Sequence, residues 1–285
     1  MIRTLFITSR PLSWVNTAYP FAAAYLLATG RIDAPLIVGT LFFLVPYNLA
    51  MYGINDVFDY ESDTRNPRKG GVEGGLLPPA QHRATLWTSV LLPVPFVVYL
   101  VVVGSWVSDL VLAISLFAVV AYSITGLRFK ERPFLDSLTS ATHFVSPAVF
   151  GLALAGARPT VPLVLILVAF FLWGCASHAF GAVQDVQADR AGGIASIATV
   201  TGARATARLA LVLYLVAGVL LLFTDWPGPL AAVLALPYAV NVAPWWNVTD
   251  ADAAGANRGW RRFLWINFAT GFLVTLLLIW WALIR

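Results

Sequence analysis

The sequence predicts an all-α fold, a polytopic membrane bundle of nine transmembrane helices, and three observations support this prediction. Hydrophobic residues make up 59% of the 285 residues and charged residues only 11%, with a mean hydropathy of +0.79, whereas soluble domains carry about 25% charged residues. The apolar residues form runs of about 20, the length that a helix needs to cross the hydrocarbon core. The basic residues gather in alternate connections between these runs. Because the connections are short, we expect one domain, residues 1–285, embedded in the lipid bilayer.

Nine apolar runs define the expected spans in chain order. They are residues 12–29, 35–54, 84–104, 108–125, 135–155, 160–182, 206–223, 228–246 and 263–283. No small-residue cleavage site follows a short apolar core, so we expect the first run to be a membrane helix rather than a cleaved signal. The single cysteine, Cys175, lies inside the sixth run. It excludes a disulfide framework and is interpreted as a small packing residue.

Fifteen of the 18 basic residues lie in, or just beside, the connections that share one side of such a bundle. These connections are residues 1–11, 55–83, 126–134, 183–205 and 247–262. Cytoplasmic loops are enriched in Lys and Arg, so we predict a multi-pass protein of the cell membrane with a cytoplasmic N-terminus. This topology also accounts for the net charge of +4, and no nucleic-acid partner is expected.

Two acidic segments follow spans on this predicted cytoplasmic side. Asp56, Asp59 and Asp63 are spaced i, i+3, i+7 after the second span, which places them within about 60° of one another on a helix. Asp185 and Asp189 form an i, i+4 pair at the end of the sixth span. A single carboxylate at a helix end is usually just solvated. Five aspartates in two short segments, out of 14 acidic residues, instead indicate a divalent-cation site, because such carboxylates repel one another without a cation.

Mg²⁺ is the ion expected there, because proteins usually hold it through one or two carboxylates and the phosphates of a substrate. Basic residues that can contact phosphoryl oxygens lie nearby in the sequence. They are Arg65, Arg68 and Lys69 after the first segment, and Arg128 and Lys130 in the third cytoplasmic loop. The general enrichment of basic residues in cytoplasmic loops is the alternative explanation for each arginine. The combination suits a diphosphate substrate.

Two histidines lie in or near the fifth and sixth spans, His143 and His178. An ionisable residue inside the membrane is a functional candidate by default. His178 precedes Asp185 by seven residues, about two helical turns, so it is a candidate for lining a cavity and for accepting a proton. A neutral, hydrogen-bonded structural histidine is the alternative.

At these residues the sequence resembles the UbiA-type intramembrane prenyltransferases, and the resemblance covers essentially the whole chain. Three stretches carry it: Asn55-Asp56-x-x-Asp59-x-x-x-Asp63, then Tyr122-Ser123 followed by Arg128-x-Lys130, and finally Asp185-x-x-x-Asp189 followed by Gly193 and Thr199. The middle stretch has Thr125-Gly126 where many members carry prolines.

Within this superfamily the chain looks most like the lycopene elongases, which make C50 carotenoids in actinobacteria and haloarchaea. The similar stretches are residues 51–63, Asn66-Pro67-Arg68-Lys69-Gly70-Gly71 and Ser9-Arg10-Pro11-x-x-Trp14.

The resemblance implies a Mg²⁺-dependent enzyme that moves a dimethylallyl group from dimethylallyl diphosphate to lycopene, on the cytoplasmic side of the membrane. The implied metal ligands and catalytic carboxylates are Asp56, Asp59, Asp63, Asp185 and Asp189, with Asn55 as a further metal ligand. The implied diphosphate-binding residues are Asn55, Arg68, Lys69, Tyr122, Arg128, Lys130 and Arg10. Aromatic faces would stabilise the allylic cation, and the acceptor's terminal double bond would attack it before a proton is lost.

Three alternatives remain at this stage. The same chemistry can use an aromatic, quinone-precursor or glycerol-phosphate lipid acceptor. A transporter also places carboxylates in a helical bundle, although its site usually lies near the bilayer midplane. A structural or assembly subunit leaves the clustered carboxylates unexplained.

Overall fold

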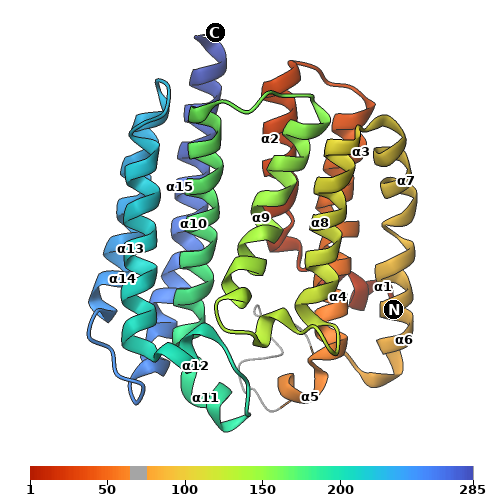
Figure 1. Ribbon diagram of the computed structural model, residues 1–285. Coiled ribbons are helices and arrows are strands. Elements are labelled where there is room, and N and C mark those ends of the chain that lie inside the picture. Colours follow the sequence, from red (N-terminus) through yellow and green to blue (C-terminus); the bar gives the residue numbers. More distant parts are fainter. Residues whose placement is uncertain (65–75, 285) are drawn as a thin grey trace. The chain divides into compact units, whose positions relative to one another are not determined.

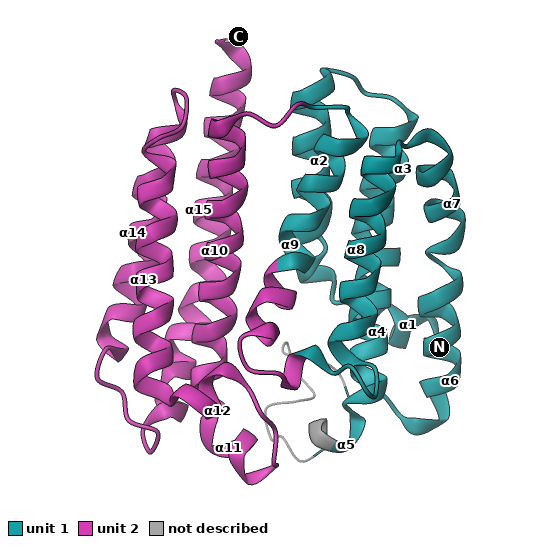
Figure 2. Cartoon of the chain, in the orientation of Figure 1, with its two compact units in different colours: residues 1–129, 142–157 teal, residues 130–141, 158–285 magenta. Residues whose placement is uncertain are grey.

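The computed structural model of the chain describes residues 1–64 and 76–284, and over those ranges it contains helices and no strands (Figure 1). The all-α prediction is therefore confirmed. The chain divides into two compact units (Figure 2). Unit 1 comprises Met1–Phe129 and Thr142–Ala157, and unit 2 comprises Lys130–Ala141 and Arg158–Arg285. Helix α9 (Leu135–Leu154) contributes to both units.

Eight helical stretches in the described part of the chain are long and apolar enough to cross a membrane. They are Ala34–Phe58, Pro79–Val103, Trp106–Ser123, Leu135–Leu154, Val161–Val183, Ala203–Leu221, Gly228–Trp245 and Ala253–Leu283. The predicted multi-pass bundle is confirmed, with one correction to the nine expected spans. The run at residues 12–29 forms α2 (Val15–Thr29), whose 15 residues extend about 22 Å, less than the hydrocarbon thickness of about 30 Å. It is short because Pro11 opens a separate 3-10 turn, η1 (Pro11–Ser13).

Unit 1 packs its helices around a cluster of aromatic rings. Its elements are α1 (Ile2–Thr8), η1, α2, α3 (Ala34–Leu44), α4 (Pro46–Phe58), α5 (Tyr60–Asp63), α6 (Pro79–Leu91), α7 (Val94–Val103), α8 (Trp106–Ser123) and the later part of α9. Phe21, Phe43 and Phe150 are fully buried, with ring centroids 5.3–5.9 Å apart. Gly151 of α9 meets α2 so closely that a Cβ would lie 2.8 Å from the carbonyl oxygen of Phe21.

The span formed by α3 and α4 breaks at Pro46, and a side chain satisfies the backbone groups at the break. Asn48 is fully buried, and its amide nitrogen donates to the carbonyl oxygens of Phe43 and Leu44 at 2.8 and 3.1 Å and to Thr17 Oγ1 at 2.7 Å. Thr17 Oγ1 itself donates to the Phe43 carbonyl at 2.7 Å. These bonds replace pairing that the proline interrupts inside the membrane, and α4 then runs to the first acidic segment.

Unit 2 is built around close contacts between α10 and α13. Besides the first residues of α9, its elements are α10 (Val161–Val183), α11 (Val186–Ala191), α12 (Ile197–Thr201), α13 (Ala203–Leu221), η3 (Gly228–Ala235), α14 (Leu236–Val242), η4 (Ala243–Trp245), η5 (Ala253–Ala256) and α15 (Asn257–Leu283). Buried alanines on both helices, such as Ala176, Ala179, Ala207 and Ala210, allow the close approach typical of membrane helices. A short turn, η2 (Phe129–Glu131), lies before α9 in the chain.

Candidate active site

The first acidic segment belongs to unit 1 and starts on the last turn of α4. The helix predicted to carry Asp56, Asp59 and Asp63 is interrupted, because α4 ends at Phe58 and α5 is a separate turn. Asp59 caps α4 with φ −97° and ψ −3°, and this ψ takes the chain out of the regular helix. Asp56 is 2% exposed and Asp59 is 7% exposed, so both carboxylates are buried rather than solvated at the interface. The side chain of Asp63, and residues Arg65, Arg68 and Lys69, lie outside the described residues.

Arg10 contacts the first of these carboxylates. Its Nη2 atom donates to Asp56 Oδ1 at 2.9 Å, and its guanidinium carbon lies 4.2 Å from the centroid of the Tyr52 ring. Tyr52 and Asp56 are one turn apart on α4, so the cation contacts both on one face of that helix. Arg10 has φ 51°, a left-handed conformation that is uncommon for residues other than glycine.

Arg128 lies beside the second carboxylate, that of Asp59. It follows the C-cap residue of α8, Ile124, by four residues. Its Nη2 atom is 3.7 Å from Asp59 Oδ1, an ion-pair distance rather than a hydrogen bond. Arg128 also has a positive φ of 39°. The two predicted cations that the structure places against the first acidic segment therefore both have strained backbones.

The end of α8 binds the same turn of α4. Ser123 Oγ donates to Asn55 Oδ1 at 3.0 Å, and this oxygen keeps a second lone pair for another contact. The neighbouring Tyr122 places its ring edge against His143, with centroids 5.4 Å apart. His143 is 3% exposed, and its Nδ1 is 3.5 Å from the hydroxyl of the fully buried Tyr47. The sequence interpretation missed Tyr47, whose position in an apolar run gives no sign of this polar contact.

The second acidic segment belongs to unit 2 and also follows a helix break. The sixth span, predicted at residues 160–182, is α10 and ends at Val183, so Asp185 and Asp189 follow it beyond a break in the helix. Asp185 is the N-cap residue of α11 and Asp189 lies within α11. Asp185 has φ −98° and ψ −5°, nearly the same values as Asp59. Each unit thus carries an aspartate at a helix break with a second aspartate four residues later.

A hydrogen-bond network fixes α11 within unit 2. Arg190 Nη1 pairs with Asp250 Oδ2 at 2.6 Å, and Arg190 Nη2 donates to the Thr199 carbonyl at 2.8 Å. The backbone N–H of Ala203 donates to Asp250 Oδ1 at 2.7 Å. This backbone bond, followed by the bond from Arg190, lowers the pKa of the Asp250 carboxyl. Arg190 therefore positions the turn that carries Asp189.

Gly193 and Thr199, which follow the second acidic segment in the stretch similar to the family, have local structural roles. Gly193 has φ 69°, and the next residue, Ile194, bonds back to the carbonyl of Asp189 at 2.8 Å. Thr199 forms a capping box with Ser196 at the start of α12. Both residues help α11 to end and the chain to turn toward α12.

His178 lies in unit 2 beside a buried polar group that the sequence interpretation missed. Its Nδ1 is 3.1 Å from Ser137 Oγ. The preceding residue, Asp136, is fully buried and accepts backbone N–H bonds from Ser137 and Ile197, both at 2.7 Å. The only sequence signal for Asp136 is its place in the first turn of a helix, where carboxylates are favourable. Because α10 ends at Val183, the seven-residue spacing of His178 from Asp185 does not imply a shared helix face.

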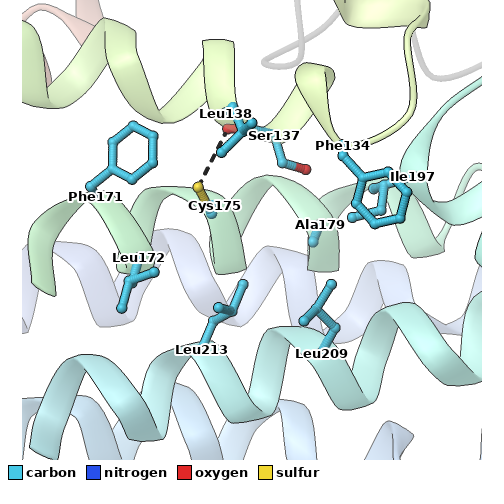
Figure 3. Close-up of a pocket in the computed structure, with 10 residues that line it drawn as sticks. All are labelled: Phe134, Ser137, Leu138, Phe171, Leu172, Cys175, Ala179, Ile197, Leu209 and Leu213. Atoms are coloured by element: carbon cyan, nitrogen blue, oxygen red, sulfur yellow. Dashed lines mark hydrogen bonds between the residues drawn. The ribbon is translucent and has the colours of Figure 1, made fainter. Parts of the chain in front are cut away.

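An apolar pocket of about 270 Å³ lies in unit 2 (Figure 3). Its lining residues are Phe134, Ser137, Leu138, Phe171, Leu172, Cys175, Ala179, Ile197, Leu209 and Leu213. Cys175 Sγ contacts the Ser137 carbonyl at 3.8 Å, so this cysteine both packs and lines the pocket. The lining residues of α10 lie about one to three turns before Val183. Such a lining suits a hydrocarbon chain.

The described carboxylates suit a metal that arrives with its substrate. Within either unit, the described acidic, histidine and cysteine side chains form no cluster of three that could hold a metal ion. Mg²⁺ is usually bound by one or two carboxylates and substrate phosphates rather than by an all-protein cage. Asp56 and Asp59 supply hard oxygen donors of this kind, with cations beside them. Lys130 is half-buried in η2.

Comparison with known proteins gives consistent results. Residues 17–269 match the sequence model of the UbiA prenyltransferase family. The chain is 54% identical to the lycopene elongase/hydratase of Corynebacterium glutamicum, over 98% of this chain and 97% of that protein. It is 59% identical to the C(50) beta-cyclic carotenoids biosynthesis protein LbtBC of Dietzia sp. (strain CQ4), over 100% of this chain and 66% of that protein. A UbiA homolog from Archaeoglobus fulgidus, solved bound to GPP and Mg²⁺, has the same fold with a TM-score of 0.71 and 17% identity, covering 94% of this chain and 99% of that one.

Proposed function

The chain belongs to the UbiA prenyltransferase family and is a multi-pass membrane prenyltransferase, and we propose that it transfers a dimethylallyl group from dimethylallyl diphosphate to lycopene. Its products would be C45 and C50 carotenoids. The observation that carries this proposal is 54% identity over nearly the whole chain to a relative named as a lycopene elongase/hydratase. The ion pairs between buried carboxylates and partly exposed arginines in unit 1 support the diphosphate part of the proposal.

The proposed metal ligands are Asn55, Asp56, Asp59, Asp63, Asp185 and Asp189, and the proposed ion is Mg²⁺. When bound, Mg²⁺ would neutralise charge that develops on the leaving diphosphate. The proposed contacts to phosphoryl oxygens come from Arg10, Arg68, Lys69, Tyr122, Arg128 and Lys130. An arginine fork matches phosphate geometry through paired N–H donors. Of these residues, Arg10 and Arg128 are supported by ion pairs with the acidic segment.

The proposed reaction breaks the C–O bond of the donor and forms one C–C bond. The electron pair of the C–O bond leaves with the diphosphate, and the acceptor's terminal double bond supplies the electrons for the new bond. The resulting cation then loses a proton. Aromatic faces near the first acidic segment, such as those of Tyr52 and Tyr122, can stabilise positive charge by about 0.5–2 kcal/mol each. His178, hydrogen-bonded to Ser137, is the proposed proton acceptor.

Lycopene is the proposed acceptor rather than an aromatic acid, a quinone precursor or a glycerol-phosphate lipid. A long hydrocarbon acceptor suits the apolar pocket of unit 2, whose lining carries heteroatoms only at Ser137 and Cys175 among its side chains. Expression in a lycopene-accumulating host, followed by pigment mass analysis, tests this proposal. We expect mass gains of one and two five-carbon units. Unextended lycopene, together with prenylation of an aromatic acid supplied with labelled donor, would refute the acceptor assignment.

The two acidic segments are proposed to serve one function within a single domain, residues 1–285. Asp59→Ala and Asp189→Ala should each abolish diphosphate release by purified protein in detergent, and the double substitution should add little further loss. This non-additivity is expected of residues that act as a unit. Full diphosphate release by both single variants would instead favour a transporter or a structural subunit.

The active site and the N-terminus are proposed to face the cytoplasm. The concentration of basic residues in alternate connections supports this orientation. A reporter that is active only outside the cytoplasm should be inactive when it is fused before Met1. Activity of the N-terminal fusion would contradict the orientation.

A further inference from the structure

Two buried carboxylates of unit 1 already have cationic neighbours in the protein without substrate. Asp56, whose side chain is 1% exposed, accepts a 2.9 Å bond from Arg10, and Asp59 lies 3.7 Å from Arg128. Burial of an ionised carboxylate is unfavourable unless an opposite charge or a hydrogen bond compensates. The two arginines therefore act as counter-ions for the acidic segment, whatever further contacts they make.

The protein holds these cations in place by unusual means. They come from distant parts of the sequence, before η1 and after α8, and both have positive φ angles. Strained residues of this kind persist only where the surroundings fix them, and they are concentrated at functional sites. Arg10 is fixed a second time, because its guanidinium lies over the face of Tyr52 while an N–H of the same group bonds Asp56.

We propose that Arg10 and Arg128 stay paired with Asp56 and Asp59 until substrate binds, and that Tyr52 positions Arg10. As a consequence, Mg²⁺ and the diphosphate bind together. This inference rests on the proposed function, because it assigns an order of events to the same site. A guanidinium beside a carboxylate oxygen opposes the approach of a divalent cation to that oxygen. An arriving diphosphate offers the guanidinium a better, bidentate partner. The carboxylate is then available to the metal, so each ligand strengthens the binding of the other.

Isothermal titration calorimetry of the full chain in detergent measures this coupling, with Mg²⁺ alone and with inorganic pyrophosphate at saturating Mg²⁺ as the two probes. In Arg10→Met the competing cation is lost, so we expect Mg²⁺ alone to bind about fivefold more tightly. The same substitution removes a charged donor to the phosphate, so we expect pyrophosphate to bind about tenfold more weakly or worse. A residue with a purely structural role, or one that only contacts phosphate, does not strengthen the binding of Mg²⁺ alone.

Substitutions of Tyr52 test its positioning role without changing any charge. Tyr52→Leu removes the ring face under Arg10, so both affinities should move in the same directions as in Arg10→Met but by less. Tyr52→Phe retains the face and should restore most of the wild-type behaviour. This pair of variants also keeps the inference testable if Arg10→Met does not fold, which circular dichroism would show.

Arg208→Met is the matched control. Arg208 lies over Trp246 at 4.6 Å, a geometry close to that of Arg10 over Tyr52, but it donates hydrogen bonds to the Trp246 carbonyl and the Asn247 side chain. Its loss should leave both affinities at wild-type values.

Three results decide the question. Tighter Mg²⁺ and weaker pyrophosphate binding in Arg10→Met and Tyr52→Leu support the inference. Unchanged or weaker binding of Mg²⁺ alone in both variants, with normal pyrophosphate binding by the wild type, overturns this inference and leaves the proposed function standing. Absence of Mg²⁺-dependent pyrophosphate binding in the wild type overturns both.

Discussion

Replacing Asp56 with asparagine removes one negative charge from the first acidic segment while keeping the shape of the side chain. In the structure the Asp56 side chain is 1% exposed and bonds Arg10 at 2.9 Å. An amide oxygen can still accept that bond, but it no longer forms an ion pair and is a poorer ligand for Mg²⁺. Two effects of different size are therefore expected, one on stability and one on catalysis.

The effect on stability is the smaller one. The charged Arg10 can still donate to the amide oxygen, so mainly the ionic part of the interaction is lost, and partly exposed ion pairs contribute only about 0.2–1 kcal/mol. Arg10 keeps 21% of its side chain exposed, so water replaces part of the lost interaction. We therefore expect the free energy of unfolding to fall by about 1 kcal/mol, which lowers the Tm of a chain of this size by about 2–4 °C. Loss of an electrostatic stabiliser of the transition state commonly lowers kcat by about 10²–10³, and we expect at least that for Asp56→Asn.

Diphosphate release in detergent, measured over a series of Mg²⁺ concentrations, gives the catalytic effect, and thermal unfolding of the same samples gives the stability. Asp136→Asn is the matched control, since Asp136 is equally buried but accepts two backbone N–H bonds in unit 2. It should lower the Tm while the folded protein keeps its Mg²⁺ dependence. An Asp56→Asn protein that releases diphosphate at the wild-type rate would refute the assignment of Asp56 as a metal ligand.

Three further predictions concern packing, pH and the pocket. Gly151→Ala should lower the free energy of unfolding by about 1–3 kcal/mol in denaturant titrations, because the new methyl group would lie 2.8 Å from a backbone oxygen of α2. Wild-type stability of this variant would show that α2 and α9 move apart easily. Asp250 has a pKa below its usual value of 3.8 in the folded protein, so its contribution to stability is present above about pH 4 and is lost as the pH falls through the folded pKa. Asp250→Asn should therefore lower the Tm at pH 7 more than at pH 3, and an equal difference at both pH values would contradict the lowered pKa of Asp250 in the folded protein. Cys175, the chain's single cysteine, lines the pocket and should react with a membrane-permeant maleimide more slowly when lycopene is bound. Phospholipid alone should give no protection, and Leu213→Trp should reduce the protection by lycopene because it narrows the pocket. Equal reaction rates with and without lycopene would exclude this pocket as the lycopene site.

Apolar patterning was enough to predict the helical membrane fold, because the length of a membrane helix is set by the bilayer rather than by its neighbours. It failed at positions where the backbone leaves the helix. The run at residues 12–29 contains its break within the first residues, where Pro11 starts a separate turn, and α2 is correspondingly short. Composition alone does not show how many residues the break removes from the helix.

The acidic segments were found from their spacing, but the spacing did not predict the helix break within the first of them. Asp56, Asp59 and Asp63 fit one helix stripe, yet α4 ends at Phe58 and Asp59 turns the chain. The turn depends on tertiary contacts such as the Arg10 and Arg128 pairs, which connect residues 46 and 69 positions apart. Those pairings, like the bond between Ser137 and His178, follow from the folded structure and have no local signal in the sequence.

The break between α3 and α4 has a consequence for how the first acidic segment is delivered. A membrane helix that kinks leaves carbonyl groups without partners in a medium that offers no water, and here the side-chain amide of Asn48, together with Thr17, takes up that role. The direction of α4 is thus set by a buried group of hydrogen bonds at Asn48, about two helical turns before Asp56. Replacing Asn48 with an aliphatic residue would allow the direction of α4 to change, and the carboxylates at the C-terminal end of α4 would be displaced the most.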